Sequence, residues 1–244
     1  MSAFDVFLYA LVTALATGLG AIPFLFVRRM PRRWLGFSNA VAAGLMTGAS
    51  VGLLSEGLAY DAVRLGAGAL IGVAFIIGSQ RFLTGHSSLE FDALRGADAM
   101  KALMIVGVMT IHSVSEGVGV GVAFGGGEAL GLFITIAIAV HNIPEGLAIS
   151  LVLVPRGESV PRAAAWSVFS SLPQPLLAVP AFLFVEVFAA FLPVGLGFAA
   201  GAMLWMAFSE LLPEAFADVR PALAATTFVI AIASMLAFQA LIRG

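Results

Sequence analysis

Long apolar stretches constrain the fold of this chain more than any other feature of its sequence. A bilayer core about 30 Å thick is crossed by about 20 residues of helix at 1.5 Å per residue. Eight stretches meet that length, at roughly 4–27, 34–59, 65–83, 101–124, 129–154, 163–188, 192–214 and 221–242. The composition agrees, because 61% of the residues are hydrophobic and only 11% are charged. We therefore expect an all-α membrane protein with one multi-span domain over residues 1–244.

The first span is followed by basic residues rather than preceded by them. Arg28 and Arg29 come directly after it, whereas a secretory signal carries its basic residues ahead of a shorter apolar core. We therefore expect an uncleaved span. The chain has no cysteine, so neither disulfides nor thiolate metal ligands contribute.

Basic residues fall on alternate connections between the expected spans, which predicts the orientation in the membrane. If the N-terminus lies outside, ten of the twelve basic residues lie on the cytoplasmic side. These ten are Arg28, Arg29, Arg32, Arg33, Arg81, Arg95, Lys101, Arg156, Arg162 and Arg220. Only Arg64 and Arg243 lie outside. We expect a multi-pass protein of the cytoplasmic (inner) membrane with both termini outside.

A short internal repeat indicates how the spans are related. The sequence LLSEG at 53–57 ends the second span, and LLPEA at 211–215 ends the seventh. These two spans cross the membrane in opposite directions, so the matching segments lie at opposite faces. This arrangement is typical of an inverted repeat, here spans 1–3 and 6–8 around spans 4 and 5.

Spans 4 and 5 carry the same polar pattern, a histidine followed four residues later by Glu-Gly. His112 and Glu116 lie in the segment HSVSEG, and His141 and Glu145 lie in HNIPEG. Residues four apart share one face of a helix, so each span presents an imidazole and a carboxylate together. The two spans are consecutive and antiparallel, and both histidines lie near mid-span. The two pairs are therefore expected to converge inside the membrane.

Ionisable groups at this depth are costly, at about 2.5–3.5 kcal/mol each on insertion scales. Two facing carboxylates also repel one another. The pairs could be structural hydrogen bonds, but two of them at equal spacing and depth favour a metal or proton path. A divalent cation would offset the negative charge and accept imidazole and carboxylate ligands, a mixture that suits zinc, iron and manganese.

Further polar or soft side chains are expected at the same depth. Met46 lies near the middle of the second span, where it is either packing or a thioether ligand. Asn142 and Ser113 each follow one of the two histidines, and they offer a carbonyl oxygen and a hydroxyl. Gln174 stands between two prolines in the sixth span and offers an amide. Proline removes a backbone donor and bends a spanning helix, which frees carbonyl groups for other partners.

With these motifs the whole chain resembles the ZIP (Zrt/Irt-like) family of divalent-metal transporters, in its small bacterial branch. HNIPEGLAI at 141–149 and HSVSEG at 112–117 are close to the family's most distinctive segments, and SELLPEA at 209–215 is similar to its seventh-span ending. The resemblance implies a first metal site of Met46, His112, Glu116, His141 and Glu145. It also implies a second site, bridged by Glu116 and Glu145, that draws on Asn142.

Two positions depart from the family pattern. Ser113 stands where relatives often have asparagine, and Gln174 stands where many bacterial relatives have glutamate. Each change weakens the second site. We therefore expect one strong site and one auxiliary site, without a forecast of which metal the change favours.

The expected function is inward transport of divalent cations, with zinc as the first candidate and iron, manganese or cadmium as others. The metal ion is then a substrate, and no catalytic cofactor is expected. The alternative is an intramembrane metal-dependent hydrolase. That class would need H-E-x-x-H on one helix, whereas Ser113 and Asn142 occupy the position of its general base. A carrier of organic anions would need a mid-span Lys or Arg, which no span has.

Carboxylates at the ends of the route complete the transport hypothesis. Glu56 closes the second span on the outer side, and Glu210 and Glu214 close the seventh on the inner side. They either anchor helix ends or concentrate cations and hand them on. His86, in the loop 84–100, is either solvated or assists metal release. The expected partners are metal ions and the lipid bilayer, with a homodimer as one assembly state and no nucleic acid.

Overall fold

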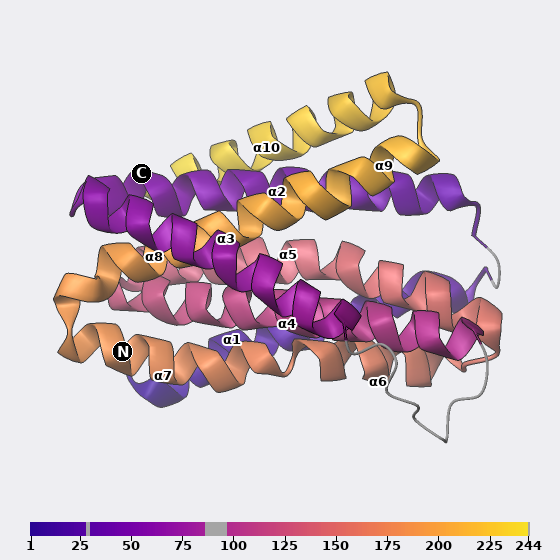
Figure 1. Cartoon of the computed structure of the whole chain (residues 1–244), viewed down its shortest axis with the longest axis horizontal. Helices are drawn as coiled ribbons and strands as arrows, with labels where there is room; N and C mark the ends of the chain where they lie inside the picture. Colours follow the sequence, from indigo (N-terminus) through magenta and orange to yellow (C-terminus); the bar gives the residue numbers. More distant parts are fainter. Residues whose placement is uncertain (28–29, 86–96, 244) are drawn as a thin grey trace.

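The computed structural model describes residues 1–27, 30–85 and 97–243, and all regular elements within these ranges are helical (Figure 1). In chain order these are α1 (Ala3–Gly18), η1 (Leu19–Leu25), α2 (Arg32–Leu58), α3 (Ala62–Gly85), α4 (Ala97–Gly125), α5 (Glu128–Leu153), η2 (Val154–Arg156), α6 (Val160–Ser171), α7 (Pro173–Val187), η3 (Ala189–Phe191), α8 (Leu192–Met206), η4 (Ala207–Leu211), α9 (Leu212–Asp218) and α10 (Pro221–Arg243).

Eight helical segments in the described part of the chain are long and apolar enough to cross a membrane. They are Ala3–Leu25, Arg32–Leu58, Ala62–Phe82, Val106–Gly125, Glu128–Arg156, Val160–Val187, Ala189–Asp218 and Pro221–Leu241. Each falls on one of the eight stretches expected from the sequence, so the predicted fold class is confirmed.

Three of the spans are interrupted. The first ends in the 3-10 turn η1, which contains Pro23. The sixth breaks at Leu172, because Pro173 starts α7 and has no N–H to continue the hydrogen bonding of α6. The seventh contains η4, a π-helical turn between α8 and α9. Pro144, by contrast, lies inside α5 without ending it. Two of these interruptions, at Pro173 and at η4, lie beside the polar residues of the interior.

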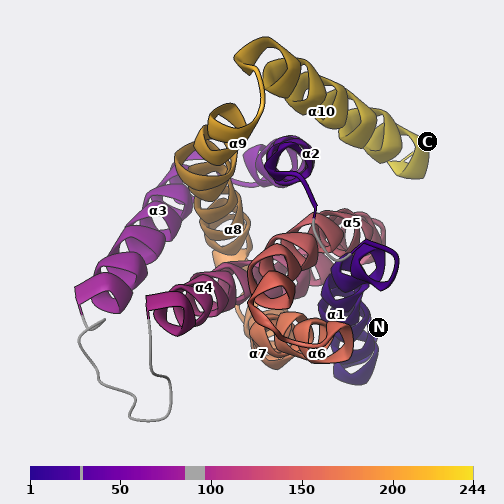
Figure 2. The ribbon, with the colours of Figure 1, turned by 90° about the vertical axis from the view of Figure 1, so that its right-hand side faces the viewer.

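The packing of the spans has the symmetry expected of an inverted repeat. At the centre, α4 lies along α5 (Figure 2). Around this pair, α7 packs on α4 as α1 packs on α5, and α3 pairs with α8 as α10 pairs with α2. Exchanging spans 1–3 with spans 6–8, and span 4 with span 5, converts each of these pairs into the other. The arrangement therefore supports the predicted relation between the two halves.

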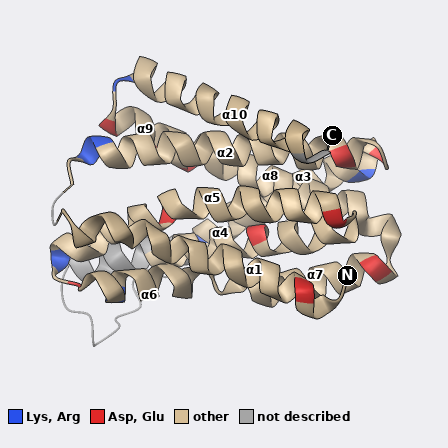
Figure 3. Ribbon diagram, turned by 180° about the vertical axis from the view of Figure 1, so that it is seen from behind, with Lys and Arg blue, Asp and Glu red and all other residues tan. Residues whose placement is uncertain are grey.

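The ends of the spans separate the charged residues along the long axis. Both termini lie at one end of the bundle (Figure 1). The start of α2, the turn before α10 and the connection between α5 and α6 lie at the other end, where basic residues gather (Figure 3). Arg32 pairs there with Asp218 at 3.3 Å. This separation agrees with the predicted charge asymmetry, and the sidedness itself remains a proposal.

Side chains are distributed as in a protein that faces lipid. Large apolar residues such as Phe4, Leu70 and Val63 are mostly exposed. Polar ones are buried instead, among them Asn39, Ser50, His112, Glu116, His141 and Gln174. In water, the exposure of so many apolar side chains would be unfavourable. In a bilayer, these side chains contact lipid acyl chains. The interior polar residues therefore mark the candidate site.

Candidate metal centre

A buried group of three side chains on α4 and α5 can hold a metal ion. Glu116, His141 and Glu145 each provide one ligand atom, and these three atoms lie within 4.8 Å of one another. His141 Nε2 is 2.9 Å from Glu116 Oε1, and both side chains are fully buried. The i, i+4 spacing predicted from the sequence places His141 and Glu145 on one face of α5, and the antiparallel α4 brings Glu116 to meet them.

The imidazole of His141 is oriented from behind. Its Nδ1 lies 3.1 Å from the carbonyl oxygen of Ala137, one turn earlier in α5. A backbone carbonyl only accepts hydrogen bonds, so Nδ1 carries a hydrogen and Nε2 is directed at the cluster. Ligating histidines in proteins are held in this way by a partner on the second ring nitrogen.

His112 takes a different position from His141. Its Nε2 is 3.0 Å from Glu210 Oε2, while Nδ1 has no hydrogen-bond partner in the structure. The Glu210 contact is an ion pair by distance, without a directed hydrogen bond between the two side chains. His112 is still near enough to Glu145 and Glu116 to interact with them electrostatically. Its contact with Glu210 adds a second imidazole–carboxylate pair beside the cluster of three.

The position of Glu210 follows from the π-helical turn η4. Such a turn adds one residue to a helix and is frequent at functional sites. It lies in the seventh span immediately before Leu212 and Pro213, and it turns Glu210 toward α4. Sequence reasoning placed Glu210 at the inner mouth of the route but did not anticipate its contact with His112, because a π-helical turn has no distinct sequence pattern.

A chain of amide groups lies on the other side of Glu116. Gln174 Nε2 donates to Glu116 Oε2 at 2.5 Å, and Gln174 Oε1 accepts from Asn142 Nδ2 at 3.2 Å. Thr13 of α1 completes it, because its hydroxyl lies 2.5 Å from Gln174 Oε1 and its carbonyl accepts from Asn142 Nδ2 at 2.8 Å. Sequence reasoning missed Thr13, for which the only signal was a hydroxyl within an apolar span.

Two other residues predicted for the site make no polar contact with the cluster. The Met46 side chain is completely buried, within an apolar core that includes Leu45 and Met203. Ser113 Oγ is buried and has no hydrogen-bond partner among the residues that the structure describes. Both remain predicted contributors. His86 lies outside the described residues.

The predicted mouth residues lie as follows. Glu210 and Glu214 line one cavity of about 340 Å³ together with Gln80, Val108, Ser209 and Pro213. Glu214 Oε2 also accepts from Asn39 Nδ2 of α2 at 2.9 Å, a contact that was not predicted from the sequence. Glu56 is partly exposed in the last turn of α2, at the end of that helix farthest from Arg32.

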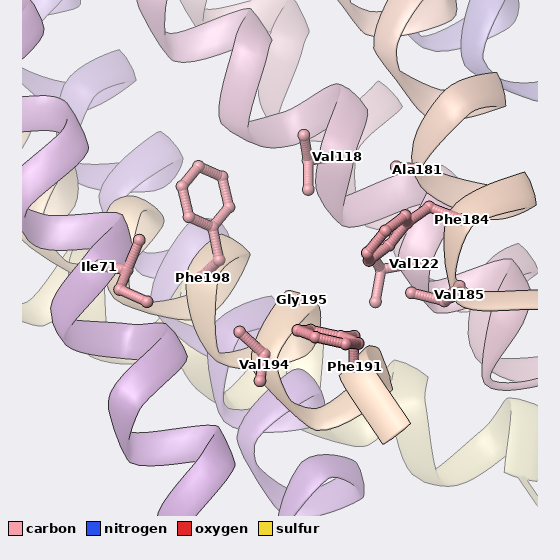
Figure 4. Close-up of a pocket in the computed structure, with 10 residues that line it drawn as sticks. All are labelled: Ile71, Val118, Val122, Ala181, Phe184, Val185, Phe191, Val194, Gly195 and Phe198. Carbon is pink, nitrogen blue, oxygen red and sulfur yellow. The ribbon is translucent and has the colours of Figure 1, made fainter. Parts of the chain in front are cut away.

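A second cavity has a different chemical character. It measures about 250 Å³ and is lined by apolar side chains of α3, α4, α7 and α8, with Phe191 of η3, including Val118, Phe184 and Phe198 (Figure 4). The side chains drawn in Figure 4 contain only carbon atoms, so they offer no ligand for a cation. The cavity at Glu210, by contrast, is lined by two carboxylates, one of which lies 3.0 Å from His112.

The donor set fits a divalent transition-metal ion. One imidazole nitrogen and two carboxylates are ligands that zinc accepts in tetrahedral sites, with a fourth position open to a further ligand. Buried carboxylates without a cation would repel one another. Among the described residues, the ion pairs in this region join His112 to Glu210 and His141 to Glu116.

Eight helical segments long and apolar enough to span a membrane, around a buried His–Glu cluster, define a multi-span membrane protein whose interior has side chains able to hold a metal ion. The chain belongs to the ZIP zinc transporter family, whose model matches residues 85–239. This is a family of transporters rather than enzymes, which leaves the hydrolase alternative without support.

Relatives agree with the family assignment. A putative zinc transporter of Arabidopsis thaliana is 47% identical over 99% of the chain, although the match covers 39% of that longer protein. The zinc transporter GufA of Myxococcus xanthus is 34% identical over 84% of the chain and 86% of its own length. The zinc transporter ZIPB of Bordetella bronchiseptica is 31% identical over 82% of the chain and 69% of its own length.

Proposed function

We propose that this protein carries divalent metal cations, zinc first among them, across the cytoplasmic membrane into the cytoplasm. The observation that carries the proposal is the buried cluster of Glu116, His141 and Glu145, whose ligand atoms lie within 4.8 Å. It offers an ion several ligands at once in the buried interior of the helix bundle. The names of the relatives, which are zinc transporters, favour zinc over other divalent ions.

Along this route the ion contacts two groups of ligands in turn, which we call stations. The first station is Glu116 with His141, and the second is Glu145 with His112. Glu116 and His141 form the outer part of the cluster. Glu145 and His112 lie one helical turn, about 6 Å, nearer the cytoplasmic end, because α4 and α5 are antiparallel. His112 then leads to Glu210 at 3.0 Å, and Glu210 lines the cavity that also contains Glu214. Met46 supplies a thioether to the first station, and Glu56 attracts ions at the outer end.

The charge of the ion offsets the electrostatic cost of burying two carboxylates in the cluster. Two carboxylates within 4.8 Å of one another are unfavourable in an apolar interior, and a divalent cation cancels their charge. At the inner cavity the ion exchanges these ligands for carboxylates with access to water. Oxygen ligands of this kind release ions readily, so the ion leaves toward the cytoplasm.

No nucleotide-binding motif is present in the sequence, so the driving force is a gradient of the ion itself, a proton gradient or the membrane potential. Uptake into proteoliposomes, measured for a panel of divalent ions with and without a pH gradient, tests the function, the preference and the coupling together. We expect uptake of zinc, and loss of that uptake in Glu145→Ala. The matched control is Glu128→Ala, which changes an exposed carboxylate at the start of the same helix. Absence of uptake by the wild-type protein for every ion would refute the proposal.

The proposed orientation has its own test. Ten of twelve basic residues lie on one set of connections, so tags at both termini should be labelled from outside intact cells. Labelling that requires permeabilised cells would reverse the orientation and with it the order of the two stations.

A further inference from the structure

The chain of side chains beside Glu116 contacts one of the two carboxylates that a second metal ion is expected to bridge. It crosses four helices, from Thr13 on α1 through Asn142 on α5 and Gln174 on α7 to Glu116 on α4. All four side chains are buried, with exposed fractions of 0% in each case. We call this set the amide relay.

The orientation of both amide groups in the amide relay is fixed by one backbone group. The carbonyl of Thr13 can only accept, so the Asn142 nitrogen, at 2.8 Å, must face it. The same nitrogen lies 3.2 Å from Gln174, so the Gln174 atom at that place must be its oxygen. The Gln174 nitrogen therefore points at Glu116 Oε2, at 2.5 Å. The Thr13 hydroxyl lies 2.5 Å from Gln174 Oε1 and 2.7 Å from the carbonyl oxygen of Ala10, and when its single hydrogen points at Gln174 it stabilises the same orientation.

Glu116 is consequently engaged at both of its oxygens. Oε2 accepts from the Gln174 amide, while Oε1 faces His141 Nε2 at 2.9 Å on the side of the three-residue cluster. A carboxylate that bridges two ions needs one free oxygen for each of them. With Oε2 taken by an N–H donor that a neutral side chain holds in place, only the Oε1 side remains open to a cation.

We propose that the amide relay takes the place of a second metal ion, so that the transport site holds one ion per chain, and that Thr13 is a positioning residue for it. This inference rests on the proposed function, because it assumes that Glu116, His141 and Glu145 bind the transported ion. The Gln174 amide donates a hydrogen bond to Glu116 Oε2, where a metal ion would otherwise accept a lone pair from that oxygen. It thereby keeps the carboxylate aimed at the remaining site.

Metal stoichiometry tests the proposal on the purified full-length protein. Equilibrium dialysis against Zn²⁺ should give one bound ion per wild-type chain and two per chain in Gln174→Glu, since the substitution replaces the donor with a ligand. Two tightly bound ions in the wild-type protein, or an unchanged count in Gln174→Glu, would overturn it. If the wild-type protein binds no ion in the first place, the proposed function fails instead, so the two failures are distinct.

The role of Thr13 has a matched pair of variants. Thr13→Val keeps the shape but removes the hydroxyl, and it should weaken binding of the single Zn²⁺ about three- to tenfold, the range of one net hydrogen bond. Thr13→Ser keeps the hydroxyl and should restore wild-type affinity. In the Gln174→Leu background, Thr13→Val should have no further effect, because no amide remains to be oriented. Equal loss in both backgrounds, or wild-type affinity in Thr13→Val, would remove Thr13 from the relay.

Discussion

The helices α4 and α5 carry the same motif and occupy equivalent places in the two halves, yet their histidines have different partners. The inverted repeat converts the contact of His141 with Glu116 into a contact of His112 with Glu145. The first is present at 2.9 Å, but His112 Nε2 lies 3.0 Å from Glu210 instead. The same motif on two helices related by the repeat can therefore place its histidines next to different partners.

Two features outside the motifs produce this asymmetry. The π-helical turn η4 brings Glu210 to His112, whereas residues 49–53, which correspond to η4 in the repeat, lie within the uninterrupted helix α2. Beside His141, Asn142 is tied to Thr13 and Gln174, whereas Ser113 beside His112 has no hydrogen-bond partner. The side chains around His141, which we call the α5 half, are therefore held by more hydrogen bonds than those around His112, which we call the α4 half. The α4 half lies next to the inner cavity. This contrast suits a binding station followed by a release station.

The largest difference between the two helices should appear when their histidines are removed. His141→Ala should weaken metal binding more than about 100-fold, since loss of mere outer-shell partners already costs about 10–100-fold. His112→Ala should weaken binding far less while slowing transport. Isothermal titration and uptake by proteoliposomes measure the two quantities, with the amount of folded protein checked by size exclusion. Equal binding losses in the two variants would mean that both histidines belong to one site.

The glycines that follow the two glutamates should differ in their tolerance of a methyl group. A Cβ at Gly146 would lie 1.7 Å from the carbonyl oxygen of Thr17, and one at Gly117 would lie 2.6 Å from that of Gln174. Gly146→Ala should therefore lower the free energy of unfolding by about 1–3 kcal/mol or more, and Gly117→Ala by less.

Thermal unfolding in detergent measures this ranking. Gly78→Ala on α3 is the control, because nothing lies within 4 Å of the added methyl group. If Gly117→Ala were the less stable of the two, the α5 half would not be the more tightly packed one.

The inner carboxylates should affect the rate of transport rather than the affinity of the central site. We expect Glu210→Gln combined with Glu214→Gln to reduce uptake at low metal concentration about tenfold, equivalent to about 1.4 kcal/mol in the barrier. Binding at the cluster should change little, because neither side chain belongs to the group of three. Glu56→Gln, at the opposite end of the route, serves as the comparison. Uptake at the normal rate in the double variant would reduce Glu210 and Glu214 to helix anchors.

The smallest expected effect is the coupling between His112 and Glu210. Because the two side chains touch at 3.0 Å, the effects of His112→Ala and Glu210→Gln on uptake should not add. A double-mutant cycle should give a coupling of about 0.5–3 kcal/mol. A matched cycle of His141→Ala with Glu210→Gln should show less coupling. Additive effects in the first cycle would mean that the contact has no part in transport.

Local sequence was enough to predict the elements and the faces that carry chemistry. Apolar length predicted eight spans, which is reliable because a bilayer fixes the number of residues needed to cross it. The i, i+4 spacing predicted that Glu145 shares a face with His141, since the helical period is a local property. The prolines that flank Gln174 predicted a bend in the sixth span, and the structure interrupts that span at Pro173, because the missing N–H acts on its own turn of helix.

Contacts between spans were decided by the tertiary structure alone. The spans are apolar on nearly all sides, so their sequence periodicity does not specify how each is rotated against its neighbours. That rotation determines that His141 meets Glu116, and the additional residue of the π-helical turn determines that His112 meets Glu210. Thr13 lies 161 residues from Gln174 in the chain and reaches it only because α1 packs between α5 and α7. Residue types and spacing defined which groups are available, and helix packing decided which of them meet.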